Sequence, residues 1–190
     1  MKKTTSLFQR NYETDRQVRD EIVPGAEWVA AGEGIATQKL DGTSCLVRAG
    51  RLYKRHDAKA GKTPPPGFAA AQEPDPKTGH WPGWVPVGEE TADRWHRAAW
   101  AAMSPPIADG TYELCGPKIQ GNPENLAEHT LLRHGAILLP EVPRTFAALR
   151  DWLETHNVEG VVWHHPDGRM VKIKARDFGL QRKSNHHQPK

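Results

Sequence analysis

The segment Lys39-Leu40-Asp41-Gly42-Thr43 decides how the rest of the sequence is interpreted. Strand-like residues 35–40 precede the Asp-Gly pair, and strand-like residues 43–48 follow it at once. Because Asp-Gly between two strands favours a tight turn, the ordinary interpretation is a hairpin with Lys39 beside its turn. The alternative is that this geometry holds one lysine amine at the mouth of a cleft between strands. The motif is short, so its context has to decide between the two.

Composition limits the function classes. A chain of 190 residues and 21.2 kDa fits one domain, with or without a small appendage. The net charge of +3 permits a nucleic-acid partner without requiring one. The two cysteines, Cys45 and Cys115, exclude a disulfide scaffold and a four-cysteine zinc site, and they favour reduced thiols in a cytoplasmic protein. We also expect no membrane span and no signal peptide.

Periodicity indicates an α+β fold of antiparallel strands with flanking helices. We expect strands at residues 27–30, 35–40, 43–48, 51–55, 111–115, 130–133, 136–139, 158–164 and 169–174. We expect helices at residues 15–22, 91–103 (capped by Thr91) and 143–157, and a short one within residues 116–128. Lys39 would then belong to an antiparallel meander. Because strand side chains alternate between faces, Lys172 and Lys174 share one face of the last strand.

The predicted organisation has three parts. They are an N-terminal segment (residues 1–26), a folded domain (27–180) and a basic flexible tail (181–190), whose His186-His187 pair is only a weak metal signal. A Pro- and Trp-rich loop at residues 56–90 interrupts the domain and is expected to contain no central strand. Its Trp81 and Trp84 either pack inward as anchors or present rings to nucleic-acid bases.

Five short motifs follow one another along the chain. They are Lys39-x-Asp41-Gly42, Arg55, Glu113, Glu159-Gly160 and Lys172-x-Lys174. Singly, each has an ordinary interpretation as surface or rim charge. In this order they resemble the motifs of the covalent nucleotidyltransferases, the superfamily of ATP-dependent DNA and RNA ligases and mRNA capping guanylyltransferases. The resemblance spans about residues 27–180. Residues 64–86 and 113–117 are most similar to the small RNA 5′-to-3′ ligases, a group with a human cytosolic member.

The resemblance implies an adenylation domain and a chemistry. Lys39 would attack the α-phosphate of ATP and become lysyl-AMP, with Lys172 and Lys174 as further catalytic residues. A free lysine amine has a pKa of about 10.4, so a lysine nucleophile needs positive charge nearby to lose its proton. Glu159 would bind Mg²⁺ (or Mn²⁺), which takes carboxylate and phosphate oxygens. The AMP would pass to an RNA 5′-phosphate, and a 3′-hydroxyl would displace it.

The resemblance also implies nucleotide-binding residues, and it has departures. Besides the three lysines and Glu159, the implied nucleotide-binding residues are Asp41, Gly42, Arg55, Glu113 and His134. His134 stands where relatives carry an adenine-stacking aromatic residue. Ser44 stands where many relatives carry arginine, and Arg48 is the nearest substitute. Arg48, Trp81 and Trp84 are the candidate nucleic-acid contacts.

Sixteen residues follow Lys174, so we expect no C-terminal OB-fold, which argues against a DNA ligase or a capping enzyme. Three alternatives remain: a minimal DNA ligase or other nucleotidyltransferase, a non-catalytic nucleic-acid-binding module, and a generic α+β domain with a fortuitous lysine.

Overall fold

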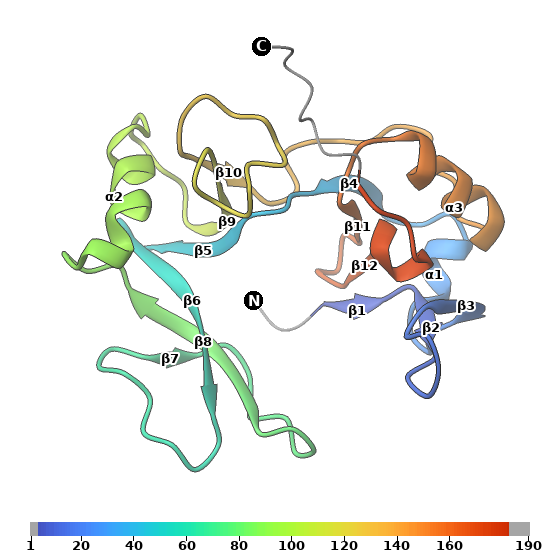
Figure 1. The fold of residues 1–190 in the computed structure, drawn as a ribbon, viewed down its shortest axis with the longest axis horizontal. Helices are drawn as coiled ribbons and strands as arrows, with labels where there is room; N and C mark the ends of the chain where they lie inside the picture. The colour runs from blue at the N-terminus through green and yellow to red at the C-terminus, as the bar shows by residue number, and fades with distance from the viewer. Residues whose placement is uncertain (1–3, 183–190) are drawn as a thin grey trace. The chain divides into compact units, whose positions relative to one another are not determined.

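The computed structural model describes residues 4–182 of the chain (Figure 1). The predicted tail from residue 183 onward, including His186 and His187, lies outside the described residues. The described chain divides into two compact units. We call residues 41–134 the central unit, and residues 4–40 with 135–182 the terminal unit. The chain passes between the units after Leu40 and again after His134.

The terminal unit is built on a four-stranded sheet. Its strand order is β1 (Thr5–Ser6), β12 (Met170–Lys174), β11 (Gly160–His164) and β4 (Ile35–Lys39). β1 runs parallel to β12, and the other neighbours are antiparallel. The unit also contains the strand pair β2 (Phe8–Arg10) and β3 (Val18–Ile22), the helices α1 (Glu27–Ala30) and α3 (Phe146–Thr155), and the 3₁₀ turn η2 (Ala175–Phe178).

The two faces of this sheet have different chemistry. Val161, Trp163, Val171 and Ile173 are at most 3% exposed and pack into one core with Leu149 of α3. The residues between them point to the opposite face, because strand side chains alternate. In β12 this alternation leaves Lys172 and Lys174 half-buried on that second face, as the sequence predicted. One face is therefore apolar core and the other is cationic.

The central unit contains a six-stranded antiparallel sheet and one helix. The strand order is β10 (Thr130–Arg133), β9 (Gly110–Cys115), β5 (Thr43–Arg48), β6 (Arg51–Lys59), β8 (His80–Pro86) and β7 (Ala69–Ala70). The 3₁₀ turn η1 (Thr91–Asp93) leads into α2 (Arg94–Ala101). Cys45, Val47 and Leu114 are completely buried in this unit's core. The α+β class with mostly antiparallel sheets is therefore confirmed.

The predicted hairpin at Asp41-Gly42 is wrong. β4 pairs with β11, whereas β5 pairs with β6 and β9 in the sheet of the other unit. Gly42 is required for close packing rather than for a turn: a Cβ there would lie 2.2 Å from the carbonyl oxygen of Leu114. Lys39 therefore ends a strand of one unit, and the chain then enters the other unit.

Several local predictions are also wrong. Residues 27–30 are helical rather than extended, because Trp28 and Val29 are both buried and a two-faced strand would expose one of them. Residues 18–22 form β3 instead of a helix, since they pair with β2. Residues 116–128 contain no helix, and Leu138 forms only an isolated bridge with Thr37. Thr91 is not an N-cap, because it is the first residue of η1. The N-cap of η1 is Glu90, and the N-cap of α2 is Asp93.

The loop at residues 56–90 contains a strand that the sequence did not predict. β8 lies between β6 and the two-residue strand β7, although it includes Pro82. Pro82 lies outside the pairing with β7, which involves only Gly83 and Trp84, so its missing N–H falls where β8 has one strand neighbour. Its carbonyl oxygen accepts a hydrogen bond from the Ala71 amide at 2.9 Å. Within residues 4–182 no helix is long and apolar enough to span a bilayer.

The core face of the terminal sheet yields a stability prediction. Trp163 is 0% exposed, so Trp163→Ala is expected to lower the free energy of unfolding by about 3–5 kcal/mol through lost burial and a residual cavity. Ile35 lies in the same sheet but is 61% exposed, so Ile35→Ala should cost no more than about 0.5 kcal/mol. Urea denaturation of both variants measures the difference, and equal losses would contradict the assigned faces.

Candidate active site

The site in the terminal unit is organised around Gly160. In β11 this glycine lies directly opposite Lys39 of β4 on one side and opposite Lys174 of β12 on the other. Strands are spaced about 4.8 Å apart, so the two lysine backbones lie about 10 Å apart. A Cβ on Gly160 would approach the Ile173 carbonyl oxygen to 2.1 Å, so only glycine fits between them. The register thus places both amines on one face with no side chain between their attachment points.

Glu159 connects the two lysine amines. The Lys39 Nζ lies 2.5 Å from Glu159 Oε2, and the Lys174 Nζ lies 2.8 Å from Glu159 Oε1. Lys39 also donates to the carbonyl oxygen of Leu40 at 3.3 Å. Burial of the carboxyl group by itself raises its pKa, but the ammonium groups of Lys39 and Lys174 outweigh burial and lower the pKa of Glu159 below its ordinary value. Glu159 is therefore an anion at neutral pH and holds both amines.

Lys172 lies one row further along the same face. Val162 separates it from Thr37 in the register, as Gly160 separates Lys174 from Lys39. Burial, together with the charges of Lys174 and Lys39, lowers the pKa of Lys172 to about 8. Within residues 4–182 no carboxylate forms an ion pair with Lys172. An anionic ligand at this face would stabilise its charged form.

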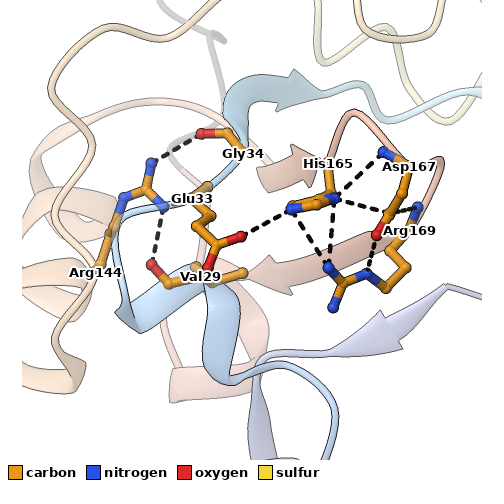
Figure 2. A network of polar contacts seen from close by, with 7 residues as sticks. All are labelled: Val29, Glu33, Gly34, Arg144, His165, Asp167 and Arg169. Carbon is orange, nitrogen blue, oxygen red and sulfur yellow. Dashed lines mark hydrogen bonds and ion pairs between the residues drawn. The ribbon is translucent and has the colours of Figure 1, made fainter.

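A polar network holds the far ends of these strands (Figure 2). Arg144 donates hydrogen bonds to the carbonyl oxygens of Val29 at 2.9 Å and Gly34 at 3.0 Å, and also to that of Glu33. This fixes the turn that leads into β4. His165, in the turn between β11 and β12, lies 2.8 Å from the Glu33 carboxylate. The network therefore ties the start of the lysine-bearing strand to the hairpin that carries Glu159 and Lys174.

The central unit brings together a second group of predicted residues. Glu113 is 8% exposed; its Oε1 accepts a hydrogen bond from the Gly42 amide at 3.1 Å, and its Oε2 lies 2.7 Å from His134 Nε2. The Asp41 amide donates to Glu124 Oε1 at 3.2 Å. Glu124 was not predicted, and only its position in a loop opposite this amide identifies it. Asp41, Gly42, Glu113 and His134 are thus linked by contacts within one unit.

Five buried side-chain polar atoms in the central unit have no hydrogen-bond partner within the described residues. Ser44 Oγ and His134 Nδ1 are two of them, and the others are Trp81 Nε1 and the two ring nitrogens of His96. Ser44 lies directly opposite Glu113 in the strand register, so one of these atoms is next to the Glu113–His134 pair. Buried polar atoms are normally hydrogen-bonded, so Ser44 Oγ and His134 Nδ1 lack a partner that such atoms usually have. Ser44 is the position at which the sequence departs from the ligase pattern.

The nucleic-acid candidates belong to two strands of the central unit: Arg48 ends β5, and Trp81 and Trp84 lie in β8. Trp84 is 3% exposed, and the Arg55 guanidinium lies 5.1 Å from its ring centroid. This burial favours the anchor interpretation of Trp84 over a base-stacking platform. Trp81 packs edge-on against Phe68 with centroids 5.2 Å apart. Arg48 lies 5.1 Å from the centroid of the Tyr53 ring. Base or phosphate contacts by Arg48 and Trp81 stay a prediction.

A metal would depend on few protein ligands. Within residues 4–182 no three His, Cys, Asp or Glu side chains gather into a metal-binding group. Glu159 is a single carboxylate, and both of its oxygens already contact lysine ammonium groups. A metal ion bound here would have to replace at least one of these ion pairs and take its other ligands from a bound phosphate or from water.

The three lysines of the terminal unit form one cationic group. A lysine amine beside a carboxylate, with two further lysines on the same face, suits a ligand that carries phosphate. A family model described as RNA ligase 1 matches residues 101–188 of this chain. The matched range includes Glu113, His134, Glu159, Lys172 and Lys174, whereas Lys39 lies before it.

Curated relatives agree with the family model. The chain is 30% identical over 136 residues to RNA ligase 1 of Danio rerio, and 30% identical over 137 residues to RNA ligase 1 of Pongo abelii. These matches cover 54% and 55% of this chain, and 42% of each relative's length. RNA ligase 1 of Mus musculus is 28% identical over 137 residues. The comparisons confirm the resemblance and support an RNA ligase-like nucleotidyltransferase family for this chain.

The Glu159 ion pairs give a stability prediction. Glu159→Gln should lower the free energy of unfolding at pH 7 by about 2 kcal/mol, since Lys39 and Lys174 lose a charged partner. Because folding lowers the pKa of Glu159, its contribution is present above the ordinary glutamate value of about 4.3 and is lost as pH falls through the folded value. Urea denaturation at pH 7 and pH 3 measures this. The exposed Glu154→Gln is the control, and an equal loss there would contradict the account.

Lys172 should destabilise the protein at neutral pH. Folding lowers the pKa of Lys172 to about 8, which means that the folded state disfavours the charged amine. The resulting loss of folding free energy is complete below pH 8 and disappears above about pH 10.4. Lys172→Met should therefore raise the free energy of unfolding by about 1 kcal/mol at pH 7 and have a smaller effect at pH 9.5. Thermal or urea unfolding at both values tests this. The exposed Lys59→Met should change neither, and a destabilised Lys172→Met would contradict the prediction.

Proposed function

We propose that this chain is an ATP-dependent RNA ligase that uses Lys39 as its nucleophile. The observation that carries the proposal is the placement of the Lys39 amine 2.5 Å from Glu159, with Lys174 on the other oxygen of the same carboxylate. The similarity to RNA ligase 1 supports the choice of RNA over other acceptors. The activity, the nucleotide, the metal and the RNA ends all belong to the proposal.

The first step would form a bond between the Lys39 Nζ and the α-phosphorus of ATP while the bond to the pyrophosphate oxygen breaks. The amine has to lose its proton before it can form this bond. Lys172 and Lys174, on the same face of the sheet, would compensate the negative charge that develops on the phosphate oxygens. A bound Mg²⁺ would supply further charge neutralisation, with Glu159 as its protein ligand.

The second and third steps would consume the lysyl-AMP. An oxygen of an RNA 5′-phosphate would attack the same α-phosphorus and release the Lys39 amine. A 3′-hydroxyl would then attack the activated 5′-phosphate and release AMP. The nucleotide contacts expected of Gly42, Arg55, Glu113 and His134 stay a prediction. The reduced state of Cys45 and Cys115, both free thiols, fits a cytoplasmic location.

Substitution of the nucleophile tests the proposal. Lys39→Arg keeps the charge beside Glu159 but removes the amine that forms the bond, so covalent retention of label from α-labelled ATP and Mg²⁺ should fall at least about a thousandfold. The matched control Lys59→Ala, at an exposed position of β6, should keep full labelling. Denaturing electrophoresis measures the retained label. Undiminished label in Lys39→Arg would refute the assignment, and release of the label by nicked DNA but not by RNA would identify a DNA ligase.

A further inference from the structure

The terminal unit contains a cavity that borders the proposed adenylation site. It has a volume of about 450 Å³ and lies between the N-terminal segment and the cationic face of β12. Its lining includes Ser6, Arg10, Tyr12, Lys172, Lys174 and Arg176. The wall from residues 4–12 is present because β1 pairs in parallel with β12 and places Ser6 beside Lys172. A distant part of the chain thus completes a cavity against two of the three site lysines.

The charges of this cavity are only partly compensated. Arg10 forms an ion pair with Asp177, which is 3% exposed, and Lys174 pairs with Glu159. Among the described residues no carboxylate pairs with Lys172 or Arg176. Uncompensated cations that share one concave site attract an anion, and a half-buried amine gains most from such a ligand.

A hydroxyl group points to the same conclusion. Ser6 lines the cavity, and its Oγ is buried without a hydrogen-bond partner in the described part of the chain. A buried hydroxyl normally donates a hydrogen bond, so an acceptor that reached this hydroxyl from the cavity would satisfy it. A phosphate group satisfies both requirements, because it carries negative charge and accepts several hydrogen bonds.

Tyr12 at the rim of the cavity favours the phosphate of a nucleic-acid strand over the phosphate tail of ATP. Tyr12 is 75% exposed and lines the cavity beside the cations. An exposed aromatic ring next to positive charge is suited to stacking on a nucleic-acid base whose phosphate lies in the site. The phosphate tail of ATP has no base at that end to use such a ring. The cavity also shares Lys174 with the Glu159–Lys39 ion pairs, so a strand end bound here lies beside the proposed nucleophile.

We propose that this cavity binds the 5′-phosphate end of a single RNA strand, with Arg176, Lys172 and Ser6 on the phosphate and Tyr12 against the first base. This inference rests on the proposed ligase function for its substrate class. It assigns recognition of the 5′-phosphate to the N-terminal segment and β12, both within the terminal unit.

Binding measured without ATP tests the inference separately from catalysis. Fluorescence anisotropy would compare a 5′-phosphorylated RNA oligonucleotide with the same sequence ending in a 5′-hydroxyl. The unsubstituted protein should prefer the phosphorylated strand by at least about tenfold, and Arg176→Ala should remove most of that preference. The matched control Arg150→Ala, at a partly exposed arginine of α3, should retain it. No preference, or a preference unchanged in Arg176→Ala, would overturn the proposal.

Two further sets of variants test the contact of Tyr12 with a base and the possibility that the cavity binds ATP instead. Tyr12→Leu should weaken the binding of both oligonucleotides about tenfold. Tyr12→Phe keeps the ring and should bind both with the affinity of the unsubstituted protein. Arg176→Ala should leave lysyl-AMP formation from ATP unchanged. If it weakened adenylation as strongly as RNA binding, the cavity would hold the phosphate tail of ATP and the inference would be wrong. A protein that binds 5′-phosphorylated RNA as expected but forms no lysyl-AMP would refute the proposed function and leave this site standing.

Discussion

The carboxylate of Glu159, shared by two lysines across a glycine, is the interaction on which the site depends. The like charges of Lys39 and Lys174, on the two strands that flank β11, repel each other, and a half-buried anion between them offsets that repulsion. The geometry requires three strands in one register, with Gly160 opposite both Lys39 and Lys174. The apolar core on the far face, centred on Trp163 and Ile173, holds that register in place.

The same constraint explains why the site is poised for a ligand. Lys39 and Lys174 are balanced by one carboxylate, and Lys172 has no carboxylate partner in the described chain. The cationic face therefore carries more positive charge than its own side chains neutralise, at a cost in stability. Proteins commonly accept such a cost where a ligand supplies the missing charge. The cavity beside β1 extends this face. Neighbouring cations could therefore bind the phosphate of a nucleotide and the phosphate of an RNA strand.

Local sequence patterns predicted how side chains are placed within a single strand. The distances between side chains of different strands depend on long-range strand pairing. Alternation in β12 correctly put Lys172 and Lys174 on one face, because that property belongs to five consecutive residues. The position of Lys39 relative to Glu159 depends on β4 pairing with β11, about 120 residues away in the sequence, and no local signal encodes it. Asp41-Gly42 was misassigned as a turn because a glycine needed for contact with Leu114 looks the same in sequence as one needed for a turn. The cavity wall from residues 4–12 was not foreseen in detail, since it depends on the parallel pairing of β1 with β12.

The most direct measurement is peptide mass mapping of the unmodified protein after incubation with ATP and Mg²⁺. The account predicts one AMP group, attached through nitrogen to Lys39 and to no other residue, because Lys39 is the amine that ends its strand beside Glu159. AMP on Lys172 or Lys174 instead, or a protein that stays unmodified with ATP, would contradict the claim that this ion-paired lysine is the nucleophile.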